Sequence, residues 1–209
     1  MLAMPRKAFV FLSLGFSFLQ TVLATSRTDP PSGALVVRAG TTNQQEYQSV
    51  SSALAALPND SSSRSIFIYP GTYNEQVYIT RPGPLEVRIQ MNTVIDSDCK
   101  TRKIYGYTMD TTTYKFNTVT IQAGCSAKKA GSDDASGTLR IHKDNFAMYN
   151  VDVKNTFGPG SQAIAISQYG SKVGLYACGF YGYQDTLYAN KGAQVYLNGY
   201  IEVLFHMTS

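Results

Sequence analysis

Residues 161–199 read SQAIAISQYGSKVGLYACGFYGYQDTLYANKGAQVYLNG, a series of short apolar or alternating runs separated by Gly, Asn and Asp. Short runs of this kind with turn residues between them predict β-strands. The pattern also extends toward the N-terminus. The predicted strands are residues 34–38, 66–69, 76–79, 118–122, 138–141, 148–153, 163–167, 173–178, 186–189 and 194–197.

The pattern of strands is compatible with a sandwich, a barrel or a solenoid, and a sandwich is the most common of these. Two features favour a solenoid. Hairpin signals between matched strands are nearly absent, with Asn198-Gly199 as the exception. The strands also occur in clusters divided by small residues, as stacked coils require. No fixed repeat length is visible, so the pattern alone does not decide between a solenoid and the more common sandwich.

Residues 45–57 (QEYQSVSSALAAL) predict an amphipathic helix, and no other segment predicts one convincingly. Tyr47, Val50, Leu54 and Leu57 recur at helical spacing, and Pro58 ends the pattern. In a solenoid this helix is expected to cap the N-terminal end.

The first 24 residues are typical of a secretory signal peptide. Arg6 and Lys7 precede an apolar run that ends at Val22-Leu23-Ala24, and this run is shorter than the ~20 residues of a membrane span. We therefore expect a secreted, extracellular protein with no membrane segment, and a single domain over residues 25–209. Removing Arg6 and Lys7 lowers the net charge from +4 to +2, which does not indicate a nucleic-acid partner.

The cysteines and histidines do not predict a metal site. Cys99, Cys125 and Cys178 are widely spaced, and His142 and His206 form no ligand cluster. The odd number of cysteines leaves at least one thiol unpaired within the chain.

Two stretches contain candidate catalytic groups. Asp185 lies in GYQDTL, residues 182–187, beside aromatic residues, where desolvation of a carboxyl would raise its pKa and suit it to proton donation. Gln162 precedes a strand, and its amide is a candidate hydrogen-bond donor to a developing oxyanion. In isolation, each would more often be an ordinary turn or loop residue.

Four segments together resemble the pectin methylesterases: GYQDTLY, SQAIAIS, DTTTYKFNTVTI and PGTYNEQVYI, in that family's order. PSGALVVRAG and YQSVSSALAAL resemble its fungal branch. The resemblance implies an all-β fold, the right-handed parallel β-helix of pectin-lyase-like solenoids. It implies a monomeric carbohydrate esterase, or pectinesterase, that hydrolyses methyl esters of homogalacturonan to pectate and methanol, without metal or organic cofactor.

The resemblance also implies roles for individual residues. In this family one aspartate attacks the C6 carbonyl of a methyl-esterified galacturonate, while the other protonates departing methanol and then activates water. At the matching positions, Asp185 is the acid/base, and Gln162 and Gln184 stabilise the oxyanion. Thr113 and Gln162 contact the sugar, and Tyr183 packs against a sugar face.

Two segments depart from the family pattern. Residues 87–103 have no counterpart and contain six charges in 17 residues, so we expect a projecting loop. Residues 203–209 stand where the family continues into VDFIFG, whose Asp is the nucleophile. Retained introns would explain both segments. On this interpretation the chain is C-terminally truncated and inactive.

Other functions are also compatible with parts of this sequence. A non-catalytic β-helix that binds pectin is the alternative, and a poorly folding fragment is a third interpretation, because an open solenoid end exposes apolar surface. A pectate lyase is disfavoured because no Asp/Glu cluster suits calcium.

Overall fold

The computed structural model of the protein describes residues 26–60, 62–80 and 102–204. The helices are α1 (Val50–Ala56), α2 (Ala127–Ala130) and α3 (Asp133–Ser136), with a 3₁₀ turn η1 at Tyr114–Phe116. The strands are β1 (Leu35–Val37), β2 (Glu46–Tyr47), β3 (Ser65–Ile68), β4 (Gly71–Asn74), β5 (Val77–Ile79), β6 (Arg102–Gly106), β7 (Val119–Ala123), β8 (Leu139–Ile141), β9 (Phe146–Tyr149), β10 (Asp152–Asn155), β11 (Ile166–Gln168), β12 (Val173–Tyr176), β13 (Gly179–Gly182), β14 (Leu187–Ala189), β15 (Gln194–Leu197) and β16 (Tyr200–Val203).

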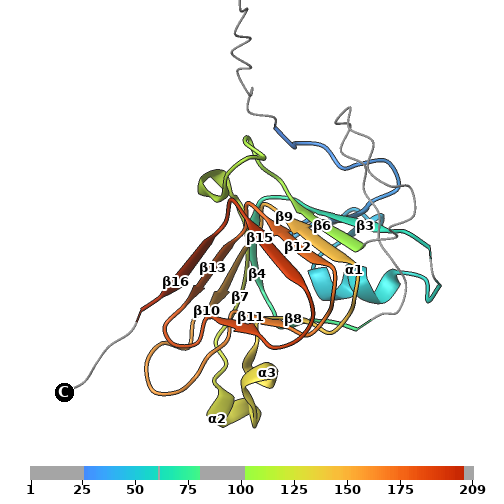
Figure 1. The fold of residues 1–209 in the computed structure, drawn as a ribbon. Coiled ribbons are helices and arrows are strands. Elements are labelled where there is room, and N and C mark those ends of the chain that lie inside the picture. Colours follow the sequence, from blue (N-terminus) through green and yellow to red (C-terminus); the bar gives the residue numbers. More distant parts are fainter. Residues whose placement is uncertain (1–25, 61, 81–101, 205–209) are drawn as a thin grey trace, which may run out of the picture.

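The strands form three parallel sheets that surround one core (Figure 1). The strand orders are β15-β12-β9-β6-β3-β1-β2, β16-β13-β10-β7-β4 and β14-β11-β8-β5. Consecutive strands such as β9, β10 and β11 belong to different sheets, so the chain passes through all three sheets before it pairs with itself again. The expected right-handed parallel β-helix is therefore confirmed, and the sandwich alternative is wrong.

Alternation of apolar and polar residues places the core inside the coils. In the five-stranded sheet, Ile121 pairs with Tyr73 and with Val153, and Val153 pairs with Phe180. All four side chains are buried. Burying an apolar side chain of this size contributes about 1.5–3 kcal/mol, so each inward row stabilises the stacking of one coil on the next.

The seven-stranded sheet meets the five-stranded sheet at sharp corners. Asn150, Ala177 and Asn198 follow β9, β12 and β15, and their φ angles are 54°, 50° and 53°. This left-handed conformation turns the chain from one sheet to the next within two residues. Asn198-Gly199 therefore forms a corner between parallel sheets and not a hairpin. The predicted single strand 148–153 is wrong for the same reason, because Asn150 divides it into β9 and β10.

Other predicted strand boundaries needed smaller corrections. Segment 163–167 becomes regular only from Ile166, at the start of β11. Strands β2, β4, β6, β13 and β16 were not predicted, and β4 and β13 each begin with glycine, which weakens a strand pattern.

The predicted helix 45–57 is shorter than expected, because α1 starts at Val50. Ser49 is its N-cap and forms a capping box with Ser52, so the helix cannot extend further back. Residues 46–47 instead form β2, which pairs with β1. Val50 and Ala53 of α1 are buried in the core, and the helix packs on β1, β2 and β5 at the N-terminal end.

Helices α2 and α3 correct the expectation of a single helix. Both lie in the connection between β7 and β8, on the outside of the sheets (Figure 1). Ser126 and Ser132 cap them by accepting hydrogen bonds from Lys129 N and Ala135 N. Each helix has only four residues, too few to show a periodic apolar pattern.

The two atypical segments lie largely outside the described residues, as does the predicted signal peptide at 1–24. Of segment 87–103, the last two residues belong to β6, where Lys103 pairs with Ser65 and Ala147, so the predicted loop boundary is wrong at that end. Of segment 203–209, Val203 pairs with Gly182 as the last residue of β16. In the part of the chain that the structure describes, no helix is long and apolar enough to cross a membrane.

Asp134 on α3 connects this helix to the four-stranded sheet. Its carboxylate accepts hydrogen bonds from Arg140 Nη2, from Ser167 Oγ at 2.6 Å and from His142 Nε2 at 2.8 Å. Burial acts to raise the pKa of Asp134, but these hydrogen bonds outweigh it and lower the pKa to about 2. The charged carboxylate is therefore the form that the fold stabilises.

Replacing Asp134 by Asn should lower the free energy of unfolding by about 1–2 kcal/mol at pH 7, allowing for solvent screening of a partly exposed group. The ionised form stabilises the fold above the ordinary carboxyl pKa near 3.8, and this contribution is lost as the pH falls through about 2. Urea denaturation of both proteins from pH 7 to pH 2 should therefore show a difference that shrinks with acidification. Asp133→Asn, on the same helix, is the control and should cost less than about 0.5 kcal/mol. A pH-independent difference would contradict the role of the Asp134 charge.

Candidate active site

Four of the predicted site residues lie at one edge of the β-helix, where the chain leaves the five-stranded sheet for the four-stranded sheet. Gln162 lies between β10 and β11, and Tyr183, Gln184 and Asp185 lie between β13 and β14. Ala163 N donates to Gln184 O at 3.1 Å, and Ala127 N donates to Gln162 O at 2.7 Å. Backbone hydrogen bonds thus stack these turns from consecutive coils, which brings Gln162 and Gln184 together.

Asp185 occupies a turn that its neighbours hold in place. Its φ angle is 59°, a left-handed conformation that is uncommon for residues other than Gly, Asn and Asp. The next residue, Thr186, is buried and donates from Oγ1 to Glu202 O at 2.6 Å. The preceding Gly182 leaves no room for a side chain, because an added Cβ would lie 2.6 Å from Thr186 Oγ1. Close packing on both sides therefore fixes the backbone of Asp185.

The expected desolvation of the Asp185 carboxyl is wrong for the described residues. Asp185 and Gln162 are exposed, and Gln184 and Tyr183 are half-buried. The turn lies between strands β13 and β14, and Asp185 is exposed there. Ser161 Oγ donates to Gln162 Oε1 at 3.5 Å. Within the described residues the Gln162 amide NH₂ makes no hydrogen bond, so this NH₂ group is available to a ligand.

Thr113 is not brought to this edge. It precedes β7 and is the N-cap of η1, where its hydroxyl accepts a hydrogen bond from Lys115 N at 3.3 Å. Its carbonyl accepts a hydrogen bond from Asn150 Nδ2, also at 3.3 Å. Thr113 thus lies at the start of the parallel strands and Asp185 beyond their end, separated by about 13 Å of strand length.

A pectinesterase family model matches residues 34–205. The chain belongs to the pectinesterase family. Pectinesterase A of Emericella nidulans is 43% identical over 178 residues, which cover 85% of this chain and 48% of that protein. A probable pectinesterase A of Aspergillus oryzae is 40% identical over 195 residues, or 93% of this chain and 54% of that protein. The chain spans about half the length of the curated relatives it matches.

Solved structures of pectin methylesterases have the same fold. The Aspergillus niger enzyme superposes with a TM-score of 0.73 at 40% identity, over 85% of this chain and 52% of that one. The Erwinia chrysanthemi enzyme gives a TM-score of 0.65 at 20% identity, over 84% of this chain and 50% of that one. The parallel β-helix is therefore the fold of the family to which this chain belongs.

In this pectinesterase-family chain, a polar row crosses the outer face of the five-stranded sheet near the Asp185 edge. Its five members lie opposite one another on adjacent strands: Asn74, Gln122, Lys154, Tyr181 and Glu202. Lys154 Nζ lies 4.7 Å from the centroid of the Tyr181 ring, and that ring lies 5.7 Å from the Tyr200 ring. The sequence prediction did not include this row, although alternation in β7 and β10 could have identified its polar members.

Asp152, the first residue of β10 in the five-stranded sheet, has a carboxyl group that the sequence prediction missed. Burial raises the pKa of Asp152 above its ordinary value, although Asn117 Nδ2 donates to Asp152 Oδ1 at 2.9 Å. An added Cβ at the neighbouring Gly179 would lie 2.6 Å from both Asp152 Oδ1 and Tyr181 Oη, so both oxygens pack against this glycine. The group lies on the Thr113 side of the sheet, away from Asp185.

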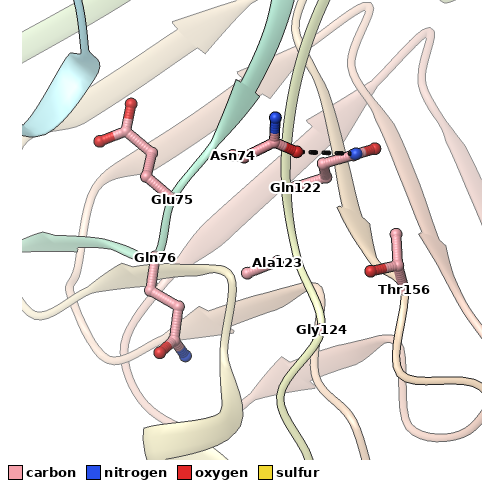
Figure 2. A pocket seen from close by; sticks show the side chains of 7 residues that line it. All are labelled: Asn74, Glu75, Gln76, Gln122, Ala123, Gly124 and Thr156. Carbon is pink, nitrogen blue, oxygen red and sulfur yellow. Dashed lines mark hydrogen bonds between the residues drawn. The ribbon is translucent and has the colours of Figure 1, made fainter.

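A pocket of ≈ 350 Å³ opens at the same edge as Asp185, over the ends of β4, β7 and β10. Figure 2 shows its lining: Asn74 at the end of β4 with the two residues that follow it, residues 122–124 at the end of β7, and Thr156 after β10. Gln122 Nε2 donates to Asn74 Oδ1 at 2.9 Å, which links the two strands. Apart from Glu75, the lining is uncharged.

Metal ligands do not gather in the described part of the chain. Within residues 26–60, 62–80 and 102–204, no three His, Cys, Asp or Glu residues are grouped so that they could hold a metal ion. Cys125 and Cys178 are free thiols and do not pair with each other. Burial raises the pKa of the Cys178 thiol to about 12, so it stays protonated near neutral pH.

Proposed function

We propose that this chain provides part of the active site of a secreted pectin methylesterase, which converts methyl-esterified homogalacturonan into pectate and methanol. The observation that carries the proposal is the stacking of Gln162, Gln184 and Asp185 at one edge of a pectinesterase-family β-helix. Two amides and one carboxyl at an open edge suit an ester of a long polymer, because the polymer can lie along the surface.

The proposed mechanism uses two carboxyl groups in turn. A carboxylate attacks the C6 carbonyl, and the carbonyl oxygen becomes an oxyanion that the amides of Gln162 and Gln184 stabilise. Asp185 protonates the methoxy oxygen as the ester bond breaks and methanol leaves. The Asp185 carboxylate then removes a proton from water, whose attack releases galacturonate and restores the first carboxylate.

The attacking carboxylate must come from the segment VDFIFG that the family has in place of residues 203–209, because residues 204–209 of this chain, LFHMTS, contain no carboxyl side chain. Gly182 pairs with Val203, so such a segment, joined after Glu202, would follow directly on the strand beside β13 and the turn that contains Asp185. Of the sugar contacts, Tyr183 belongs to the Asp185 edge, whereas Thr113 would have to bind a different part of the polymer.

Methanol release from methylated pectin tests this function. Because the relatives are about twice as long, the assay uses a chimera that joins residues 25–202 to the C-terminal half of the Aspergillus niger enzyme. Turnover by the chimera, and none by the same C-terminal half alone, is the expected result. Binding of pectin by the chimera without methanol release would instead support the non-catalytic alternative.

A further inference from the structure

The side chain of Asn155, the last residue of β10, is buried at 5% exposure and bonded through both ends of its amide. Its Oδ1 accepts hydrogen bonds from Phe157 N at 3.1 Å and Cys125 N at 3.4 Å. Its Nδ2 donates to Cys125 O at 2.8 Å, Ile164 O at 3.0 Å and Ser136 O at 3.1 Å. Such bonds are what a buried amide requires, and all of them go to backbone groups of loops.

These hydrogen bonds close two loops that lie on consecutive coils. Phe157 and Ile164 stand at the two ends of the connection from β10 to β11. Cys125 and Ser136 stand at the two ends of the connection from β7 to β8, which contains α2 and α3. The single side chain of Asn155 therefore fixes both ends of both loops.

Gln162 lies in the first of these loops, and its place depends on the residues that follow it. The loop begins with Gly158-Pro159-Gly160, where an added Cβ at either glycine would meet no described atom within 4 Å. Beyond Gln162, Ile164 N donates to Ser136 Oγ at 3.2 Å, while Ile164 O accepts from Asn155. Because Ile164 is only two residues from Gln162, these bonds set where the Gln162 amide can reach.

We propose that Asn155 is a positioning residue for the esterase reaction, which holds Gln162 where its amide can meet the oxyanion without itself touching the substrate. This inference rests on the proposed function. An oxyanion donor is effective only within about 2.7–3.1 Å of the oxyanion, and a displacement of about 1 Å can cost a factor of about 10² in rate. Releasing Ile164 would permit such a displacement.

Hydrogen exchange on the full 209-residue chain tests the structural part of this role. In Asn155→Ala, the amides of Ala163 and Ile164 should exchange about ten-fold faster, because the end of the loop is released. The amide of His142, which donates to Ile79 O in the same four-stranded sheet, should keep its protection. An equal change at all three amides would show a general loss of stability and overturn the positioning role.

A double-mutant cycle in the chimera tests the catalytic part, with methanol release as the measurement. Gln162→Ala should lower kcat by about 10²–10³-fold, the range for loss of one oxyanion donor. Asn155→Ala should lower kcat by about 10–10²-fold on its own, but by less than about two-fold when Gln162 is already Ala. The same loss from Asn155→Ala in both backgrounds would overturn the proposal, because Asn155 would then not act through Gln162.

Ser136→Ala provides a second route if Asn155→Ala fails to fold. It removes only the hydroxyl that accepts from Ile164 N and donates to Asp133 O. We expect a decrease in kcat of about three-fold, which should again disappear in the Gln162→Ala background. A decrease that persists there would contradict the role of this hydrogen-bond cluster.

Gln168→Ala is the matched control, because it removes another fully buried amide, whose Nε2 donates to Gly170 O at the opposite end of β11. It should leave kcat unchanged. Turnover by the unmodified chimera with independent losses from Asn155→Ala and Gln162→Ala would overturn the positioning role and leave the proposed function standing. A folded chimera without turnover would overturn both.

Discussion

Replacing Gly106 by Ala should lower the free energy of unfolding by about 3 kcal/mol or more, because the added methyl group would overlap backbone atoms. Gly106 ends β6, and an added Cβ would lie 1.9 Å from Asn150 O and 2.8 Å from Asn150 C. These are backbone atoms of the next coil, which cannot rotate away as a side chain can. The coils must separate locally, and the inward rows stacked on them must then lose contact.

The effect should extend beyond the corner itself. Asn150 accepts a hydrogen bond from Arg27 Nη1 at 3.1 Å, and its own amide donates to Asp110 O and Thr113 O. A displaced Asn150 would therefore release both the N-terminal segment at Arg27 and the loop that contains Thr113. Earlier proteolytic cleavage in this loop would accompany the loss of stability.

A second glycine separates steric overlap from backbone strain. Gly158 has a φ of 84° and no atom within 4 Å of an added Cβ, so Gly158→Ala should cost only the conformational penalty of about 1 kcal/mol. Gly106 needs no positive φ, so its cost would come from overlap alone. Guanidinium denaturation of both variants provides the comparison. Equal losses would show that the coils at Gly106 separate more easily than the packing indicates.

The strands of the β-helix were predictable where polar and apolar residues alternate. In β7, Val119 and Ile121 point inward between Thr120 and Gln122, and the predicted strand 118–122 nearly matches the observed one. The corners were not predictable in the same way. Asn150 and Ala177 lie inside apolar runs, and a left-handed φ in such a run leaves no mark in hydrophobic periodicity.

The helix 45–57 shows how tertiary pairing overrides a local pattern. Tyr47 fits the helical spacing with Val50 and Leu54, yet β1 offers an edge on which residues 46–47 pair as a strand. The capping box at Ser49 and Ser52 then fixes the helix start. This capping box uses Ser in place of the usual Glu or Gln, so it is a weaker signal in a sequence.

The candidate site was predictable from motifs only in part. The family resemblance predicted the residues at the Asp185 edge, and backbone stacking explains why stretches about 20 residues apart meet there. The exposure of Asp185 was not predictable, because it depends on what covers a turn outside the sheets. The pocket was also missed, since its lining comes from three coils and includes no unusual residue type.

Asp185→Asn in the chimera should lower the rate of methanol release by a factor of about 10²–10⁴, the range for loss of a general acid/base. Asn has nearly the same shape, but its amide cannot protonate departing methanol or remove a proton from water. Asn also tolerates the left-handed conformation that Asp185 adopts at φ 59°, so the turn should stay folded. The expected loss is therefore in kcat, with little change in pectin binding.

Asp60→Asn is the matched control, because it removes the same charge from an exposed loop far along the chain from the Asp185 edge. Both variants should melt within a few degrees of the unmodified chimera, and only Asp185→Asn should lose turnover. Mass spectrometry of the protein after the reaction is stopped would separate the two proposed steps. If Asp185 also activates water, an ester between the attacking carboxylate and the substrate should persist in the variant. This ester would be visible as added mass on the protein. Undiminished methanol release by Asp185→Asn would show that Asp185 takes no part in the chemistry. No other described carboxyl lies on that turn, so the edge would then serve only to bind pectin.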